Sequence, residues 1–318
     1  MKGKQGMVCM GLLLVLSSCH TGKQITASGL QRKDFQTEVN GQHTDLFTLS
    51  NKQGMEVCIT NYGARVVSIF VPDRNGKRED VVCGFSTITE YMEQRQNFGS
   101  TVGRYIGRIL NARFTLDGVE YKLVPNNGKS GHISHGGNPG FADRIWKVEQ
   151  ADTHRVCLSY LSPDGENGFP GNLKVTLVYS LGEDDNALDL TYEATTDAPT
   201  VLNLSHHSFF NISGNFTKSV EDQQLWVDAD RFTPYDDKKC VTGEYLQVAG
   251  TPLDFRMPHA IGECIDADHP QLKVVNGYDH TWELNTKGDD TRPAAWVYDP
   301  ASGRKMEIFT TEPGIQIY

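Results

Sequence analysis

Apolar and polar residues alternate along two stretches in the middle of the chain, and this pattern most limits how the chain can fold. Apolar side chains fall on every second position of residues 173–179, and residues 188–194 repeat the pattern. A period of two is typical of antiparallel strands with one buried and one exposed face. Residues 182–186, Gly-Glu-Asp-Asp-Asn, are turn formers, so the two stretches are predicted to be neighbouring strands.

Other segments favour the same class of fold. Residues 66–71 are apolar nearly throughout, which suits a strand buried on both faces, and residues 114–123 predict a hairpin with Asp117-Gly118 at its turn. Helical periodicity is confined to residues 87–96. The 31 glycines and 13 prolines supply many turns, so we predict an all-β fold, a sandwich or related double sheet.

The first residues have the form of an export signal. Lys2 and Lys4 precede an apolar run over residues 7–16, which is shorter than the roughly 20 residues of a membrane-spanning helix. Residues 16–19, Leu-Ser-Ser-Cys, resemble a bacterial lipobox. We therefore predict a signal peptide over residues 1–18, a tether over 19–40 that is anchored by lipid at Cys19, and one folded domain over 41–318. The alternative is an ordinary cleaved signal with Cys19 as a chance thiol.

This organisation implies an exported protein, periplasmic or held at the cell envelope. Loss of residues 1–18 removes two lysines and no acid, which leaves 28 basic against 40 acidic residues. Such an acidic chain repels nucleic acid and anionic membrane surfaces, so a neutral small molecule is the better-suited partner.

Cysteine and histidine spacing indicates neither a metal site nor a disulfide framework. Besides Cys19, the exported chain has five scattered cysteines with no Cys-x-x-Cys pair, although a single disulfide stays open. Ten histidines include no His-x-His or His-x-x-x-His pair, the spacings that put two ligands on one element. We expect no metal.

Two histidines lie between strand-like residues and turn formers. His135 lies in the glycine-rich run 131–137, and His207 lies at the end of a predicted strand, in Asn-Leu-Ser-His-His-Ser-Phe-Phe over residues 203–210. A neutral imidazole donates from one nitrogen and accepts at the other, and it titrates near neutral pH. Brought onto one surface, the two would form a proton-handling site. Taken singly, each is as well explained as a histidine that stabilises a turn or a strand end.

Three further polar residues are candidates, and each has a plain structural alternative. Asp279 lies in Gly-Tyr-Asp-His-Thr-Trp over residues 277–282, where an Asx-type turn is a common role for aspartate. Arg104 and Arg108 stand four residues apart, and a salt bridge at the surface is the ordinary role of such side chains. His206 precedes His207, and neighbours on a strand point to opposite faces, so only one of them can face a given site.

Six motifs follow one another along the chain, at residues 61–65, 103–109, 135–146, 162–173, 203–212 and 277–280. In this order, and from about Phe47 to Tyr318, they resemble one known family, the aldose 1-epimerases, also called galactose mutarotases. The resemblance implies an antiparallel β-supersandwich that interconverts the α and β anomers of free aldoses such as glucose and galactose, with no cofactor.

The resemblance also assigns roles to residues. His207 matches the catalytic histidine that protonates the sugar's ring oxygen, and His135 matches a second histidine that holds that end of the sugar. Asp279 and Arg108 match ligands of the sugar hydroxyls. Removing one proton while adding another is paired acid–base catalysis, for which groups that titrate near the working pH serve best.

The chain departs from the family pattern at three places. Gly107 and His206 each stand where the family has asparagine. In relatives a glutamate that acts as base follows the strand matched by residues 310–318, whereas this sequence stops at Tyr318. We therefore expect impaired activity, and an inactive lipid-anchored carbohydrate-binding module is the alternative.

Overall fold

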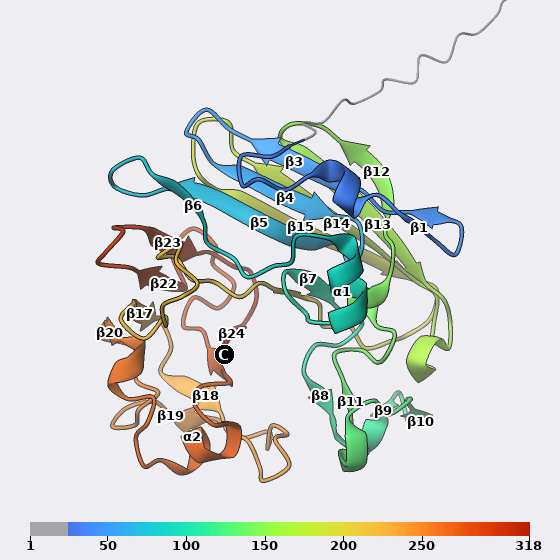
Figure 1. The fold of residues 1–318 in the computed structure, drawn as a ribbon. Helices are drawn as coiled ribbons and strands as arrows, with labels where there is room; N and C mark the ends of the chain where they lie inside the picture. The colour runs from blue at the N-terminus through green and yellow to red at the C-terminus, as the bar shows by residue number, and fades with distance from the viewer. Residues whose placement is uncertain (1–24) are drawn as a thin grey trace, which may run out of the picture.

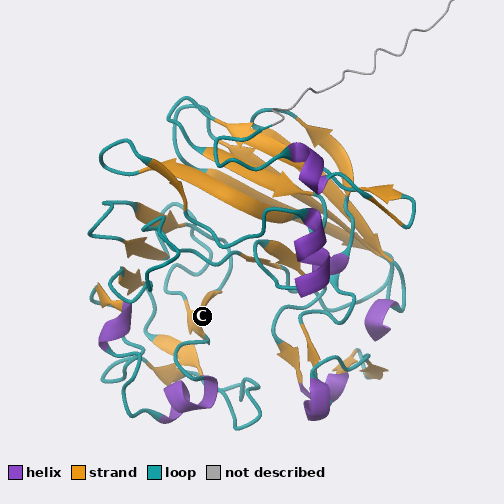
Figure 2. Ribbon diagram, in the orientation of Figure 1, coloured by secondary structure: helices purple, strands orange, loops and turns teal. Residues whose placement is uncertain are grey.

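The computed structural model describes residues 25–318 and consists mainly of antiparallel strands (Figure 1). Figure 2 shows how little of the chain is helical. The predicted signal segment and Cys19 lie outside the described residues. The predicted all-β class is confirmed, because the strands pair in layered sheets and the helices are short.

Two four-stranded antiparallel sheets form the upper part of Figure 1. One has the order β3-β4-β5-β6, with β3 (Leu46–Ser50), β4 (Glu56–Thr60), β5 (Arg65–Pro72) and β6 (Arg78–Asp80). The other has the order β12-β13-β14-β15, with β12 (Lys147–Ala151), β13 (Arg155–Ser162), β14 (Leu173–Leu181) and β15 (Leu188–Thr196). Apolar side chains of both sheets share one core, in which Val66, Trp146 and Leu177 are fully buried.

The predicted neighbouring strands are β14 and β15. They pair antiparallel from Leu173 opposite Thr196 to Leu181 opposite Leu188. Every second side chain of β14 is buried, as the alternation predicts. β5 is buried over its first five residues, which confirms the strand with two buried faces.

The predicted hairpin and helix are also present. β9 (Arg113–Leu116) and β10 (Val119–Lys122) pair across Asp117 and Gly118, which both have positive φ, as a two-residue type I′ turn requires. Helix α1 (Ile88–Gln94) begins at a capping box, in which the Thr87 hydroxyl accepts from the Glu90 backbone N–H and the Glu90 carboxylate accepts from the Thr87 N–H.

Two smaller four-stranded sheets form the later part of the chain, with the orders β20-β17-β22-β23 and β19-β18-β21-β24. Their strands are β17 (Gln224–Val227), β18 (Arg231–Thr233), β19 (Leu246–Gln247), β20 (His259–Ala260), β21 (His280–Glu283), β22 (Ala295–Tyr298), β23 (Lys305–Ile308) and β24 (Gly314–Ile317). They share a second core around Phe232, Leu253 and Trp282.

Short elements connect these layers. The pairs are β1 (Glu38–Val39) with β2 (Gln42–His43), β8 (Arg108–Ile109) with β11 (Ile133–Ser134), and β7 (Ser100–Val102) with β16 (Ser205–His207). The helices are α2 (Pro270–Val275) and the 3-10 turns η1 (Arg32–Phe35), η2 (Leu110–Ala112), η3 (Gly128–Ser130), η4 (Phe141–Asp143), η5 (Glu166–Gly168) and η6 (Ile261–Glu263).

The described part of the predicted tether packs on the domain. Phe35 is fully buried, and the Arg32 guanidinium donates to the Asp45 carboxylate at 2.7 Å. The Ala27 N–H donates to a Glu56 carboxylate oxygen at 2.5 Å. Ala27, Arg32 and Phe35 of the predicted tether therefore contact the domain that follows them.

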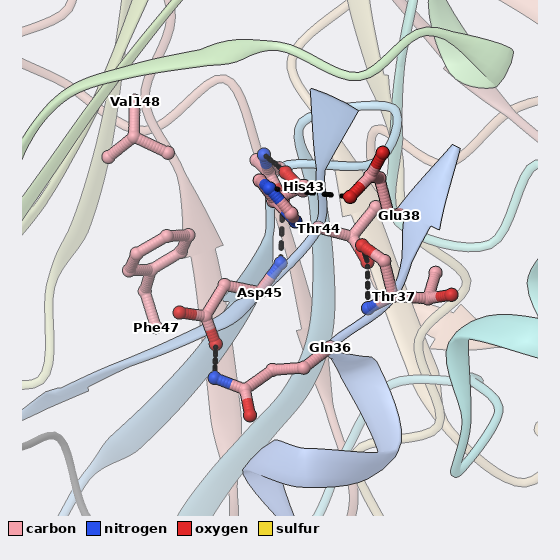
Figure 3. Close-up of a pocket in the computed structure, with 9 residues that line it drawn as sticks. Gln36, Thr37, Glu38, His43, Thr44, Asp45, Phe47 and Val148 are labelled. Carbon is pink, nitrogen blue, oxygen red and sulfur yellow. Dashed lines mark hydrogen bonds and ion pairs between the residues drawn. The ribbon is translucent and has the colours of Figure 1, made fainter. Parts of the chain in front are cut away.

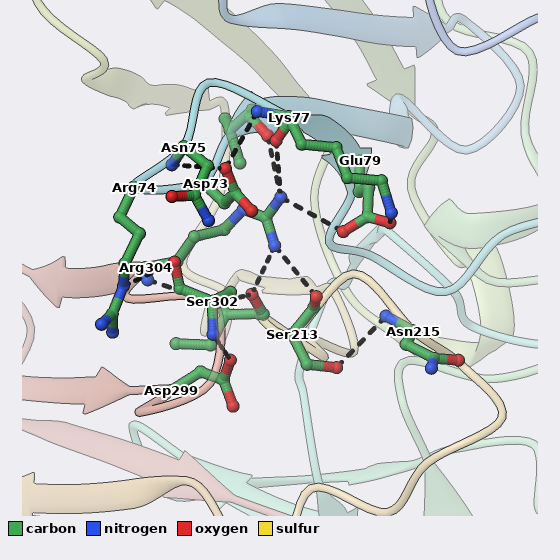
Figure 4. A network of polar contacts seen from close by, with 12 residues as sticks. Asp73, Arg74, Asn75, Lys77, Glu79, Ser213, Asn215, Asp299, Ser302 and Arg304 are labelled. Atoms are coloured by element: carbon green, nitrogen blue, oxygen red, sulfur yellow. Dashed lines mark hydrogen bonds and ion pairs between the residues drawn. The ribbon is translucent and has the colours of Figure 1, made fainter.

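Buried arginines tie loops to these sheets. Arg104, which we expected at the surface, is instead 1 % exposed because its guanidinium donates to backbone carbonyls of the loops around it. Arg304 donates to the carbonyls of Ile212, Ser213, Val71 and Lys77 (Figure 4). Each guanidinium thus satisfies carbonyls that strand pairing leaves open.

Residues 25–318 contain no disulfide, no metal-binding group and no helix that could span a membrane. The five cysteines among them are all free, with Cys58 and Cys240 buried. No group of three or more histidine, cysteine or acidic side chains in this part of the chain is arranged to hold a metal ion. No helix of the described residues has the length and apolar character to cross a membrane.

Candidate active site

The structure brings the two predicted histidines together. Their ring centroids lie 5.5 Å apart, and the ring planes are nearly perpendicular. His207 is the last residue of β16, opposite Ser100 of β7. His135 directly follows β11 and has a φ of 52°, so the chain turns there and the imidazole projects from a loop.

The alternation along β16 separates the two adjacent histidines. His207 contacts His135 and the ring of Phe209. His206 lies on the other face, next to the Tyr179 ring, and its Nε2 bonds the Ser208 hydroxyl at 2.6 Å. As predicted for neighbours on a strand, only His207 faces His135.

Backbone contacts set the hydrogen-bonding direction of the His135 ring. The Gly107 N–H donates to His135 Nδ1 at 3.3 Å, and the His135 N–H donates to the Gly107 carbonyl at 2.9 Å. A neutral ring that accepts at Nδ1 carries its proton on Nε2. Burial lowers the pKa of His135 to about 4, with smaller contributions from the positive charges of His207 and Arg108. His135 is therefore a neutral donor at physiological pH.

Asp279 directly precedes β21 and approaches the histidines from the later sheets. Its Oδ1 accepts from the Gln316 Nε2 at 2.6 Å, and Gln316 lies on β24, the partner strand of β21. Burial raises the pKa of Asp279, opposed by the Gln316 hydrogen bond and by the positive charges of Arg108 and His207. Burial also lowers the pKa of His207, and the Asp279 charge acts in the opposite direction.

Arg108 completes the set at the start of β8. Its Nη1 donates to the Lys239 carbonyl at 3.1 Å. Its positive charge lowers the pKa values of both His135 and Asp279. All four residues predicted as the site therefore lie in one cluster, contributed by β8, the loop after β11, β16 and the residue before β21.

Sequence reasoning missed Gln316 and Tyr235 as members of this cluster. Gln316 Nε2 also lies 3.5 Å from the Tyr235 hydroxyl, whose pKa burial and Asp279 raise to about 12. One signal was available for Gln316, because it is polar between Ile315 and Ile317 in the segment 310–318 that matches a late strand of the family. Tyr235 carried no signal, since it lies in a stretch that matches none of the six motifs.

The cluster combines groups suited to a neutral polyhydroxy ligand. A carboxylate accepts hydrogen bonds from hydroxyls, a guanidinium donates to them, and a neutral imidazole can do both. The two imidazoles also carry ring N–H groups and ring nitrogens that can give protons to a ligand or take them from it. Gln316 provides an amide that can donate or accept beside Asp279.

A hollow elsewhere on the molecule contains none of these residues. It has a volume of about 620 Å³ and lies between the β1–β2 hairpin, β3 and β12 (Figure 3). Its wall includes Glu38, His43, Asp45, Phe47 and Val148. It is therefore separate from the histidine cluster.

Solved structures place the fold among the galactose mutarotases. The structure of galactose 1-epimerase from Lactobacillus acidophilus superposes with a TM-score of 0.78 at 30 % identity, and it covers 89 % of this chain and 80 % of that one. The predicted antiparallel supersandwich is thereby confirmed.

Sequence comparison then identifies the family. A model of the family described as aldose 1-epimerase matches residues 45–318. Galactose mutarotase of Sus scrofa is 38 % identical over 272 residues, which are 86 % of this chain and 76 % of that protein. Aldose 1-epimerase of Escherichia coli K12 is 36 % identical over 279 residues, 88 % of this chain and 79 % of that one. The chain belongs to the aldose 1-epimerase family, as its six motifs predicted.

Proposed function

We propose that this protein is an isomerase that interconverts the α and β anomers of free aldoses at the cluster of His135, His207, Arg108 and Asp279. The observation that carries the proposal is the 5.5 Å separation of the two imidazoles, and the Asp279 charge acts on the pKa of His207. Family membership supports it, because relatives over most of the chain are named for this reaction.

The proposed reaction opens and closes the pyranose ring. A proton moves from His207 Nε2 or Nδ1 to the ring oxygen as the bond from that oxygen to C1 breaks. A water molecule takes the C1 hydroxyl proton, and the electron pair of that O–H bond forms the carbonyl of the aldehyde. The C1–C2 bond rotates, and the ring oxygen attacks the other face of C1 while both protons return. Each proton thus returns to the group that gave it up, and no cofactor is consumed.

The remaining residues bind and orient the sugar. His135 Nε2–H, fixed as a donor by the contact at Nδ1, is directed at an oxygen on the same end of the sugar as His207. Asp279 and Arg108 accept from and donate to the hydroxyls further round the ring. Holding the sugar in one pose converts proton transfer into a step between groups already in contact.

Optical rotation provides the test. Freshly dissolved α-glucose or α-galactose should approach anomeric equilibrium faster with the protein than in buffer, and a His207→Ala variant should lose the acceleration. If the unmodified protein and His207→Ala give the same rate, the proposal fails. Calorimetry on the same samples identifies the alternative, because aldose binding without faster exchange would make the protein a carbohydrate-binding module.

We also propose that the protein is exported and anchored by lipid at Cys19. The apolar run at residues 7–16 and the cysteine that closes it support this proposal. Metabolic labelling with a radioactive fatty acid should mark the protein, and Cys19→Ala should remove the label. A labelled Cys19→Ala variant, or unlabelled protein in the soluble fraction, would contradict it.

A further inference from the structure

Side-chain amides hold the chain on both sides of His135: Asn126 bonds the backbone of Ser134 before it, and Asn167 bonds the segment after it. Asn167 Nδ2 donates to the Gly136 carbonyl and to the Pro139 carbonyl, both at 2.9 Å. These acceptors flank the turn formed by residues 137 and 138. Both protons of the Asn167 amide are therefore used on the segment that follows His135.

The loop also packs closely against this amide. A Cβ added to Gly137 would lie 2.4 Å from Asn167 Cγ, and one added to Gly136 would lie 1.9 Å from the Gly103 carbonyl oxygen. Both glycines have positive φ, so the backbone reaches a position that other residues would not allow. The loop therefore lies between the 103–107 backbone on one side and Asn167 on the other.

Asn167 itself belongs to a rigid support. It lies in η5 with a φ of 51°, and its carbonyl accepts from the Val124 N–H at 2.9 Å. Its neighbour Glu166 accepts from Arg144 at 2.6 Å and from the Tyr160 hydroxyl at 2.7 Å, and also from the Ser162 hydroxyl. With a side chain only 9 % exposed, Glu166 anchors the turn to β13.

We propose that Asn167 is a positioning residue for His135, whose amide holds the loop so that the ring keeps its contact with Gly107 and directs its Nε2–H at the sugar. The chain of contacts runs from β13 through Glu166 and Asn167 to the loop, and from the loop to the ring. The catalytic meaning of this role rests on the proposed function, but the position and protonation of the ring can be measured without turnover.

Two substitutions separate the amide's hydrogen bonds from the backbone of the turn. Asn167→Gly removes the side chain and tolerates the positive φ. Asn167→Asp keeps the shape but faces two carbonyl oxygens with a group that cannot donate when ionised. Asn172→Ala is the matched control, because Asn172 lies five residues on and bonds Asp164 and Asp197 instead of the loop.

The first readout is the pKa of His135, measured in the full chain by an NMR titration of its ring. A loosened loop admits water and relieves the burial that keeps the ring neutral. We expect its midpoint to rise from about 4 toward the ordinary value near 6.5 in both Asn167 variants and to stay unchanged in Asn172→Ala. A His135 midpoint that is the same in all four proteins would overturn the proposal.

The second readout is the split between KM and kcat for anomer exchange. Because His135 is proposed to bind the sugar, losing two hydrogen bonds on its loop should raise KM by roughly tenfold in Asn167→Gly and change kcat less. A purely structural role would lower the amount of folded protein without moving KM. If the unmodified protein neither exchanges nor binds aldoses, the proposed function falls, while a shifted His135 titration would still support the positioning role.

Discussion

Arg104 and Arg108 belong to one short motif, yet they differ in burial and in how many hydrogen-bond partners their guanidinium groups have. Arg104 is 1 % exposed, and its guanidinium is fully occupied with the Ser162 and Thr200 hydroxyls and the carbonyls of Ser162, Pro163, Pro170 and Gly171. Arg108 is half-buried, and its guanidinium has one partner within the described residues, the Lys239 carbonyl. A guanidinium has five N–H donors, so Arg108 has donors left for a ligand and Arg104 has none.

The two adjacent histidines differ in their surroundings and not in hydrogen-bond saturation, because His206 Nδ1 is buried without a partner among the described residues. His206 Nε2 is bonded to Ser208, and burial with the nearby charges of His207 and Arg65 lowers its pKa to about 3. His207 faces His135, and its lowered pKa is moderated by Asp279. Residue type does not distinguish structural from functional groups here. For the arginines the difference lies in how many N–H donors the fold leaves open, and for the histidines it lies in which groups each ring faces.

The largest expected effect is on catalysis. His207→Ala removes the proposed acid and should slow anomer exchange by about 10²- to 10⁴-fold, with little change in the free energy of unfolding. His206→Asn, which restores the family's residue on the opposite face of β16, should leave the rate within about threefold. Polarimetry at neutral pH measures both. Equal losses in the two variants would show that the faces of β16 do not differ in function.

Substitution of Arg104 should mainly affect stability, whereas substitution of Arg108 should mainly affect aldose binding. Arg104→Met leaves several buried carbonyls without donors, so we expect the free energy of unfolding to fall by about 3 kcal/mol or more. Arg108→Met should change it by less than about 1 kcal/mol and should weaken aldose binding. Urea denaturation and calorimetry measure the two quantities. If Arg104→Met does not fold, Arg104→Lys, which keeps the charge but lacks the planar fork, gives the smaller loss in the same direction. A stable Arg104→Met would break the comparison.

Acid should destabilise the fold through its buried histidines. The folded-state pKa values of His135 and His206, about 4 and about 3, lie below the ordinary value near 6.5, so the unfolded chain binds more protons between these pH values. Stability therefore decreases as the pH falls from about 6.5 to about 3, by on the order of 5 kcal/mol in total. Urea midpoints at pH 7 and pH 4.5 test this. His206→Asn should flatten the dependence, and an unchanged slope in that variant would assign it to other groups.

The sequence predicted what depends on local pattern and failed where distant segments meet. The alternation of residues 173–179 predicted β14 because burial on a strand repeats every two residues. The resemblance identified His135 and His207, which the fold places in contact. Burial of Arg104 was missed because its acceptors lie 58 to 96 residues further along the chain. The packing of Phe35 on the domain was missed because a single apolar residue in a polar segment carries no periodic signal.

Substitutions of two glutamines should have the smallest effects, and they test the same contrast between structural and functional side chains. Gln271 is tied to the backbone of Tyr235, because its amide oxygen accepts from the Tyr235 N–H at 2.8 Å and its Nε2 donates to the Tyr235 carbonyl at 3.0 Å. Gln316 is exposed and lies beside Asp279. Gln271→Ala should therefore lower the free energy of unfolding by about 1–2 kcal/mol and leave aldose affinity nearly unchanged.

Gln316→Ala should do the reverse. Loss of its hydrogen bond removes an interaction that lowers the pKa of Asp279, so this pKa should rise further and the carboxylate should bind sugar hydroxyls less well. We expect aldose affinity to fall by roughly threefold to tenfold with stability nearly unchanged. Calorimetry and urea denaturation on both variants decide the matter. If Gln316→Ala lost stability and kept affinity, open hydrogen-bonding capacity would no longer mark the functional side of this molecule.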